Sequence, residues 1–235
     1  MSAPTLIACS HGTSSLEGRA AISRLIDQVR GLLPDVEVDE AFVDVQQPEI
    51  DDVVLAAVHR GPAVIVPVLL STGFHTKVDI ARAASSHSDV IATGALGPHD
   101  LLALVLESRL RDVDLRPDDA IVLAAAGSSD PAAEGDVRAM AALLSRLIRM
   151  PVTVGFAAGA LPRIADAVAA ARESGADRVV AASYVLAPGF FADVIARAGA
   201  DVVTAPLAPD VRVAGVIAER YRAAIAGAHA VPETV

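Results

Sequence analysis

The two halves of this sequence repeat the same pattern of residues. Gly12-Thr13-Ser14 recurs 115 residues later as Gly127-Ser128-Ser129, and Ile80-Ala81-Arg82-Ala83 recurs at the same interval as Ile195-Ala196-Arg197-Ala198. Within each half, apolar runs of strand length alternate with longer stretches of helical period, which is typical of a mostly parallel sheet flanked by helices. The sequence therefore predicts an α/β protein of two tandem domains that arose by duplication, each with a mostly parallel four-stranded sheet.

The expected elements follow from the apolar runs and from the turn residues between them. Strands are expected at 5–10, 36–43, 63–70, 90–93, 120–125, 152–157, 178–184 and 201–204. Helices are expected at about 16–33, 48–60, 98–111, 131–149, 161–174, 191–199 and 210–226, with one more after the loop at 71–76. Pro48 suits the first position of its helix. A polar stretch at 112–119 is typical of a linker, which places the domains at 1–113 and 118–235.

Composition excludes several classes of protein. The net charge of −10 disfavours a nucleic-acid binder, because neutralising phosphates requires clustered Lys and Arg. A single cysteine, Cys9, excludes a disulfide framework, a cysteine zinc site and a cysteine-ligated cluster. No apolar run reaches the roughly 18–20 residues that span a bilayer, and the first residues lack the pattern of a signal peptide. We therefore expect a cytoplasmic protein with no membrane segment.

Polar side chains follow the first three expected strands. His11 comes after the first strand, Asp44 after the second and His75 after the third. Because ligands bind beyond the carboxyl ends of parallel strands, these side chains are expected to converge on one edge of the first sheet. The second half has Ala126 and Phe191 at the positions of the two histidines. The first half is then the working half, unless the second half drifted without functional meaning.

Two imidazoles and a carboxylate form a site suited to divalent Fe, Co, Ni or Zn. Without a thiolate such a site holds metal loosely, which suits a protein that passes the ion on. Gly12 and Gly73 would allow the backbone to approach a bulky ligand closely. The hydroxyls of Thr13, Ser14 and Ser15 can either donate to ligand carboxylates at a helix N-terminus or cap that helix.

Three segments of the first half resemble the sirohydrochlorin and precorrin chelatases, the class II chelatases of siroheme and cobalamin synthesis. The segments are Ile-Ala-Cys-Ser-His-Gly-Thr-Ser at 7–14, Ala-Phe-Val-Asp at 41–44 with a later Pro48, and Val-Pro-Val-Leu-Leu at 66–70 followed by Gly-Phe-His-Thr-Lys-Val-Asp-Ile at 73–80. Asp44 stands where the family has Glu. The resemblance is weaker in the second half, and it implies two tandem chelatase-like domains with one active site in the first.

The resemblance implies insertion of a divalent metal, with iron favoured, into sirohydrochlorin with loss of two pyrrole protons. His11 and His75 would bind the ion and accept protons, and Asp44 would be a third ligand or a proton relay. The substrate-binding residues would be Gly12, Thr13, Ser14, Gly73, Phe74 and Lys77. The metal and the tetrapyrrole are then substrates, no tightly bound cofactor is implied, and the fused chain would be a monomer or a weak homo-oligomer.

Several alternatives remain open at this point. A cobaltochelatase of cobalamin synthesis, acting on sirohydrochlorin or precorrin-2, fits the same residues. The same ligands would also serve a carrier that binds metal or tetrapyrrole without inserting one into the other. His11-Gly12 after a strand is similar to the histidine phosphatases, but Ser10 stands where their phosphate-clamping Arg is expected. Phe190 and Phe191 offer either an apolar wall to the substrate cleft or ordinary core packing.

Overall fold

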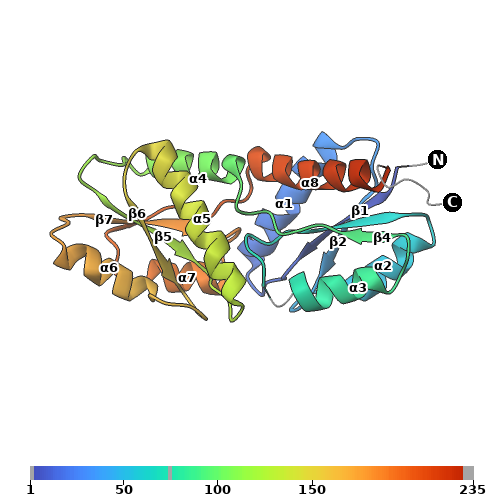
Figure 1. The fold of residues 1–235 in the computed structure, drawn as a ribbon, viewed down its shortest axis with the longest axis horizontal. Helices are drawn as coiled ribbons and strands as arrows, with labels where there is room; N and C mark the ends of the chain where they lie inside the picture. Colours follow the sequence, from blue (N-terminus) through green and yellow to red (C-terminus); the bar gives the residue numbers. More distant parts are fainter. Residues whose placement is uncertain (1–2, 74–75, 230–235) are drawn as a thin grey trace.

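The computed structural model, which describes residues 3–73 and 76–229, consists of two α/β halves lying side by side (Figure 1). The strands are β1 (Thr5–Ser10), β2 (Val38–Phe42), β3 (Ala63–Pro67), β4 (Val90–Ala92), β5 (Ala120–Ala125), β6 (Val152–Phe156), β7 (Val179–Tyr184) and β8 (Val202–Val203). The helices are α1 (Leu16–Leu32), α2 (Ile50–Val58), α3 (Ala81–Ser85), α4 (Asp100–Asp112), α5 (Pro131–Ile148), α6 (Ile164–Glu173), α7 (Phe190–Ala196) and α8 (Val211–His229), with a π-helical turn η1 (Thr76–Ile80) before α3. The expected alternation of strands and helices is confirmed.

Each half contains a four-stranded sheet in which every strand pair is parallel. The strand orders are β2-β1-β3-β4 and β6-β5-β7-β8. Every residue of β1 and of β7 is buried, because helices cover both faces of each sheet. The winding of the chain reverses between β1 and β3, and again between β5 and β7. In sheets of this order the ligand crevice lies beyond the carboxyl ends of those strands.

The last helix of each half packs on the other half. Helix α4 ends the first half and lies against α5 and β7, whereas α8 ends the second half and lies against α1 and β3. Figure 1 shows this exchange, with the red α8 above the half that contains β1 and the green α4 above the half that contains β7. The polar stretch at 112–119 therefore joins two sequence repeats whose helices are interleaved in space.

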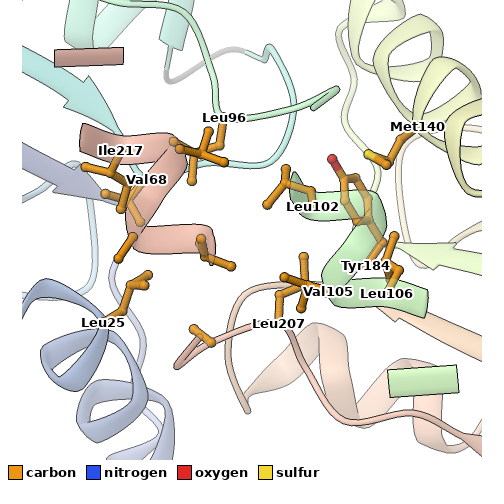
Figure 2. Packing of buried hydrophobic residues seen from close by; sticks show 14 of the residues in the cluster. Leu25, Val68, Leu96, Leu102, Val105, Leu106, Met140, Tyr184, Leu207 and Ile217 are labelled. Carbon is orange, nitrogen blue, oxygen red and sulfur yellow. The ribbon is translucent and has the colours of Figure 1, made fainter. Parts of the chain in front are cut away.

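Because of this exchange, one apolar core runs through both halves. It includes Leu25 and Val68 of the first half, Met140 and Tyr184 of the second, and Ile217 of α8 (Figure 2). Two smaller cores fill the opposite sheet faces, one beneath α2 and α3 and one beneath α6 and α7. The shared core fixes the two sheets relative to one another and thereby places their ligand edges face to face.

Three helices begin two or three residues later than expected, and α6, which begins at Ile164 rather than at 161, is one of them. Helix α2 begins at Ile50 rather than at Pro48, because the Pro48 carbonyl oxygen accepts a hydrogen bond from the N–H of Phe42 (3.0 Å) and continues the pairing at the strand end. Helix α4 begins at Asp100, and the preceding His99 caps it by accepting the N–H of Leu101 at Nδ1 (3.1 Å). None of the helices in the described part of the chain is long and apolar enough to cross a membrane.

Candidate functional site

A cavity of about 640 Å³ lies between the two halves at the carboxyl ends of their central strands. The first half lines it with residues 10–14, 45–46 and 68–73, and the second half with residues 125–129 and 184–191. Helices α1 and α5 each contribute one apolar side chain, Ile22 and Val137. The cavity therefore joins the two sheet edges at which ligand binding is expected.

His11 is the first residue after β1, and its half-buried side chain lines the cavity. Its backbone carbonyl oxygen accepts the N–H of Asp44 (3.1 Å), which fastens the loop after β1 to the loop after β2. Gly12 has a φ of +94°, and a Cβ there would collide with the carbonyl oxygen of Asp44. Glycine at position 12 is thus required for the close approach of the two loops that hold His11.

Hydrogen bonds also fix the turn that leads from Gly12 into α1. Ser15 caps the helix by accepting the N–H of Gly18 at its hydroxyl oxygen (3.1 Å), and the Thr13 hydroxyl accepts the N–H of Ser15 (3.1 Å). The side-chain oxygen of Gln46 accepts the N–H of Thr13 (2.8 Å). A hydroxyl that accepts one hydrogen bond still has its own proton to donate. Helix capping and donation to a ligand are therefore compatible roles for this turn.

The carboxylate of Asp44 lies apart from the cavity lining. The residue is exposed, and its Oδ1 accepts the N–H of Val45 (2.7 Å). Val45 and Gln46 line the cavity, whereas Asp44 lines a shallow depression on the surface beside it. The structure thus brings the backbone of Asp44 next to that of His11 but leaves its carboxylate at the surface. A role for Asp44 as metal ligand or proton relay stays a prediction.

The second half repeats the backbone of this site but has alanine at three of its polar positions. Gly127 has a φ of +82°, and its α-carbon lies against the carbonyl oxygen of Ala158 as that of Gly12 lies against Asp44. The N–H of Ala158 donates to the carbonyl oxygen of Ala126 (2.9 Å), as that of Asp44 donates to His11. Ala126, Ala158 and Ala160 stand where the first half has His11, Asp44 and Gln46. At these three positions only the first half carries polar side chains.

The remaining predicted site residues belong to the turn after β3. Phe74 and His75 lie outside the described residues, as does the side chain of Lys77. Gly73 lines the cavity, where a Cβ would stand 3.2 Å from the hydroxyl oxygen of Ser128. Among the described residues, no three His, Cys, Asp or Glu side chains gather in a group that could hold a metal ion. The meeting of His11 and His75 stays a prediction.

The cavity wall combines hydroxyl groups with apolar side chains. Its hydroxyl-bearing residues are Ser10, Thr13, Ser14, Ser71, Thr72, Ser128, Ser129 and Tyr184. None of the described residues that line it is Asp, Glu, Lys or Arg. Phe190 and Phe191 pack edge to face with ring centres 5.3 Å apart, and Phe190 is 71% exposed. Such a cavity suits a large flat ring whose polar substituents reach hydroxyls and backbone N–H groups.

Reasoning from the sequence missed three groups of this site. Gln46 lies only two residues beyond Asp44 in the same loop, which is the signal that could have found it. Ser128 and Ser129 were noted as part of the repeat and not as cavity residues. Tyr184 ends an apolar strand, and its hydroxyl donates to the carbonyl oxygen of Leu70 (3.1 Å). A polar aromatic residue at the end of a buried strand is a weak signal, because a buried tyrosine normally finds some partner.

Cys9, the residue before Ser10 in β1, lies beneath this site and is buried. Burial, together with the charge of Asp79, raises the pKa of its thiol to about 12. The thiolate is the form that binds metal, so the neutral thiol of Cys9 is a packing group.

Comparison with known proteins finds the same family twice in the chain, in agreement with the internal repeat. The CbiX family model matches residues 5–113 and again residues 120–224. A sirohydrochlorin ferrochelatase from Priestia megaterium is 27% identical over 191 residues, which cover 76% of this chain and 71% of that protein. A probable sirohydrochlorin cobaltochelatase from Halobacterium salinarum is 32% identical over 133 residues, which cover 49% of this chain and 44% of that protein.

The fold has a counterpart among solved structures. SirB from Bacillus subtilis with Fe³⁺ superposes with a TM-score of 0.83 at 20% identity, over 97% of each chain. This likeness confirms the arrangement of two tandem chelatase-like domains, and the two matches of the family model cover most of the sequence. The resemblance read from the three segments of the first half is therefore confirmed, and the chain belongs to the CbiX family of chelatases.

Proposed function

We propose that this protein inserts a divalent metal ion, with Fe²⁺ as the favoured substrate, into sirohydrochlorin. The observation that carries the proposal is the imidazole of His11 on the wall of a cavity that both halves line, with no Asp, Glu, Lys or Arg among the described lining residues. The curated relatives, a ferrochelatase and a probable cobaltochelatase of sirohydrochlorin, support this reaction. Iron is favoured because the ferrochelatase relative matches 76% of this chain and the cobaltochelatase relative 49%.

The reaction requires a group that both binds and releases an ion. Two pyrrole protons leave as the divalent ion enters the ring, so the charge balances and a base must take up the protons. A neutral imidazole presents one nitrogen lone pair near pH 7, which can coordinate the ion or accept a proton. His11 would serve in this way with His75 as the second imidazole. Asp44 would join them if its carboxylate turned away from the N–H of Val45.

The tetrapyrrole would lie in the cavity with one face toward His11. Thr13 and Ser14 can donate hydrogen bonds to its carboxylates, and the positive end of α1 favours negative charge at the same place. Gly12 keeps the cavity wall free of a side chain beside His11, and Gly73 does so beside Ser128. We assign Phe74 and Lys77 to substrate binding as well, on the resemblance of their segment to the family.

Replacement of His11 tests the proposal directly. We expect His11→Ala to lower the rate of insertion by about 100-fold or more, because the variant loses a ligand and a base at once. Metal-free sirohydrochlorin and Fe²⁺ would be mixed anaerobically and the conversion followed by visible absorption. The matched control is His59→Ala at the exposed end of α2, which should react at the wild-type rate. A His11→Ala variant that keeps the wild-type rate would contradict the assignment.

The same assay separates the alternatives. Comparing Fe²⁺, Co²⁺ and Ni²⁺ side by side identifies the preferred ion. A higher kcat/KM for Co²⁺ than for Fe²⁺ would show that the protein is a cobaltochelatase rather than a ferrochelatase. Binding of sirohydrochlorin without conversion beyond the protein-free control would indicate a carrier. Release of phosphate from a generic phosphomonoester would instead support a histidine phosphatase.

A further inference from the structure

Residues 70–73, which follow β3 and lead toward His75, are held by side chains of the second half. The hydroxyl of Tyr184, at the end of β7, donates to the carbonyl oxygen of Leu70 (3.1 Å). The carboxylate of Asp136, on α5, accepts the backbone N–H of Thr72 (2.8 Å). Two hydrogen bonds from one half thus fix the direction in which the chain of the other half leaves its central strand.

The Tyr184 contact is enclosed by first-half backbone. Tyr184 is 2% exposed, and burial together with the charge of Asp136 raises the pKa of its phenol, so the hydroxyl remains a donor. A Cβ at Gly97 would collide both with this hydroxyl and with the carbonyl oxygen of Leu70. The residue at position 97 must therefore lack a side chain for Tyr184 to reach Leu70.

These contacts run in one direction only. The two halves superpose by strand register, with Pro67 beside Cys9 as Ser183 lies beside Ala124, and by the helix caps Ser15 and Asp130. By this correspondence, Val68, Ala21 and Pro188 are the counterparts of Tyr184, Asp136 and Thr72. Val68 has no hydroxyl, Ala21 no carboxylate and Pro188 no backbone N–H. The second half therefore holds the strand-end segment of the first half, and the first half does not return these two contacts.

We propose that Asp136 and Tyr184 are positioning residues. Through them the second half, which has no counterpart of His11 or His75, sets the path of the chain from β3 toward His75. This inference rests on the proposed function, because the segment matters for catalysis only if His75 takes part. It gives the second half a role in the reaction besides lining the cavity. The role is geometric, since the hydrogen bonds of both side chains go to first-half backbone.

The first test compares Asp136→Ala with Asp136→Asn. Loss of the acceptor in Asp136→Ala should lower kcat for metal insertion by about 10- to 100-fold, since a small displacement of a reacting group has effects of that size. The KM for sirohydrochlorin should stay within about twofold. Asp136→Asn keeps an oxygen that can accept the Thr72 N–H, so it should recover most of the rate. The matched control is Glu134→Ala, which removes an acid from the same helix whose partner is Arg138.

The second variant, Tyr184→Phe, removes one hydroxyl and leaves the packing of the ring intact. Like Asp136→Ala, Tyr184→Phe should lower kcat for metal insertion, and it should change the unfolding midpoint little. A kcat within about twofold of wild type in both folded variants would overturn the inference. A rate that Asp136→Asn fails to recover would overturn it as well, because the charge rather than the hydrogen bond would then be needed.

Amide hydrogen exchange provides a readout that does not depend on the reaction. In the substrate-free protein, Asp136→Ala should increase the exchange rate of the Thr72 amide about tenfold or more and leave the amides of β1 unchanged. An unchanged Thr72 amide would overturn the inference even if the wild-type enzyme is active. Conversely, a wild-type protein that inserts no metal would refute the proposed function, whatever the exchange of Thr72.

Discussion

Gly12 and Gly127 occupy equivalent positions in the two halves, and both have a positive φ. Only the first of them follows a histidine, since Ala126 precedes Gly127, so the glycine serves the shared loop geometry rather than the ligand alone. At Gly12 the reason is visible, because the carbonyl oxygen of Asp44 occupies the space of a Cβ. The glycine next to His11 therefore has a structural explanation that does not depend on contact with a substrate.

Replacing Gly12 should destabilise the protein. Gly12→Ala places a Cβ in the left-handed region and against Asp44, so we expect the free energy of unfolding to fall by about 1–2 kcal/mol or more. Gly135→Ala is the control, because Gly135 lies in α5 with open space around its α-carbon. That change should raise the free energy of unfolding by about 0.5–1 kcal/mol. Urea unfolding measures both, and equal signs for the two variants would be inconsistent with this account.

Asp210 and two arginines join the exchanged helices α4 and α8. The carboxylate of Asp210 accepts two hydrogen bonds from the guanidinium of Arg212 (2.7 and 2.9 Å) and lies 3.6 Å from the guanidinium of Arg109 on α4. Arg212 also donates to the carbonyl oxygen of Leu104 on α4 (2.9 Å). Burial would raise the pKa of the Asp210 carboxyl, but the bonds from Arg212 and the charge of Arg109 hold that pKa below its usual value.

This lowered pKa predicts a pH dependence of stability. A carboxyl with a lowered folded-state pKa stabilises the fold above its unfolded-state pKa of about 3.9, and it loses that contribution as the pH falls through the folded-state value. Asp210→Asn should therefore lower the free energy of unfolding at pH 7 by about 1.5–3 kcal/mol, the usual loss for a hydrogen bond to a charged group. The difference from wild type should shrink in acid.

Asp27→Asn on α1 is the control for this experiment. Asp27 pairs with Arg30 at the surface, with 66% of its side chain exposed, and such pairs contribute about 0–1 kcal/mol. Chemical unfolding of the three proteins at several pH values measures the effect. A deficit of Asp210→Asn that persists unchanged at pH 2–3, below the unfolded-state pKa of about 3.9, would contradict the assignment.

The exchange of α4 and α8 makes the two halves interdependent. A fragment of residues 1–113 would carry α4 without its partners α5 and β7, and it would expose the faces of α1 and β3 that α8 covers. We expect this fragment, and likewise residues 118–235, to be poorly folded alone, because each loses apolar burial on two surfaces. Mixing the two fragments should restore a folded complex. Size-exclusion chromatography and circular dichroism measure this, and a well-folded, monomeric 1–113 fragment would refute it.

Several parts of the fold could be read from the sequence because local chemistry determines them. β1 and β5 begin and end where predicted, since each is a short and mainly apolar run with a glycine two residues beyond its end. Helix α1 was predicted to within one residue from its apolar period, and the structure shows that Ser15 caps it. The position of His11 at a cavity followed from the rule for strand ends. The predicted start of α2 at Pro48 was wrong, because the Pro48 carbonyl oxygen accepts the N–H of Phe42 and the helix begins only after this pairing.

Two features depended on segments far apart in the chain. The Tyr184–Leu70 bond spans 114 residues and the Asp136–Thr72 bond spans 64, so no local pattern indicates either of them. Helices α4 and α8 are the last helices of equivalent repeats, and both have an apolar face. Their apolar periodicity does not indicate which half each helix will cover. Apolar periodicity and turn chemistry act over a few residues and therefore reveal the elements and their duplication. The pairing of helices with sheets is chosen by the burial of both sheets at once, which exists only in the folded chain.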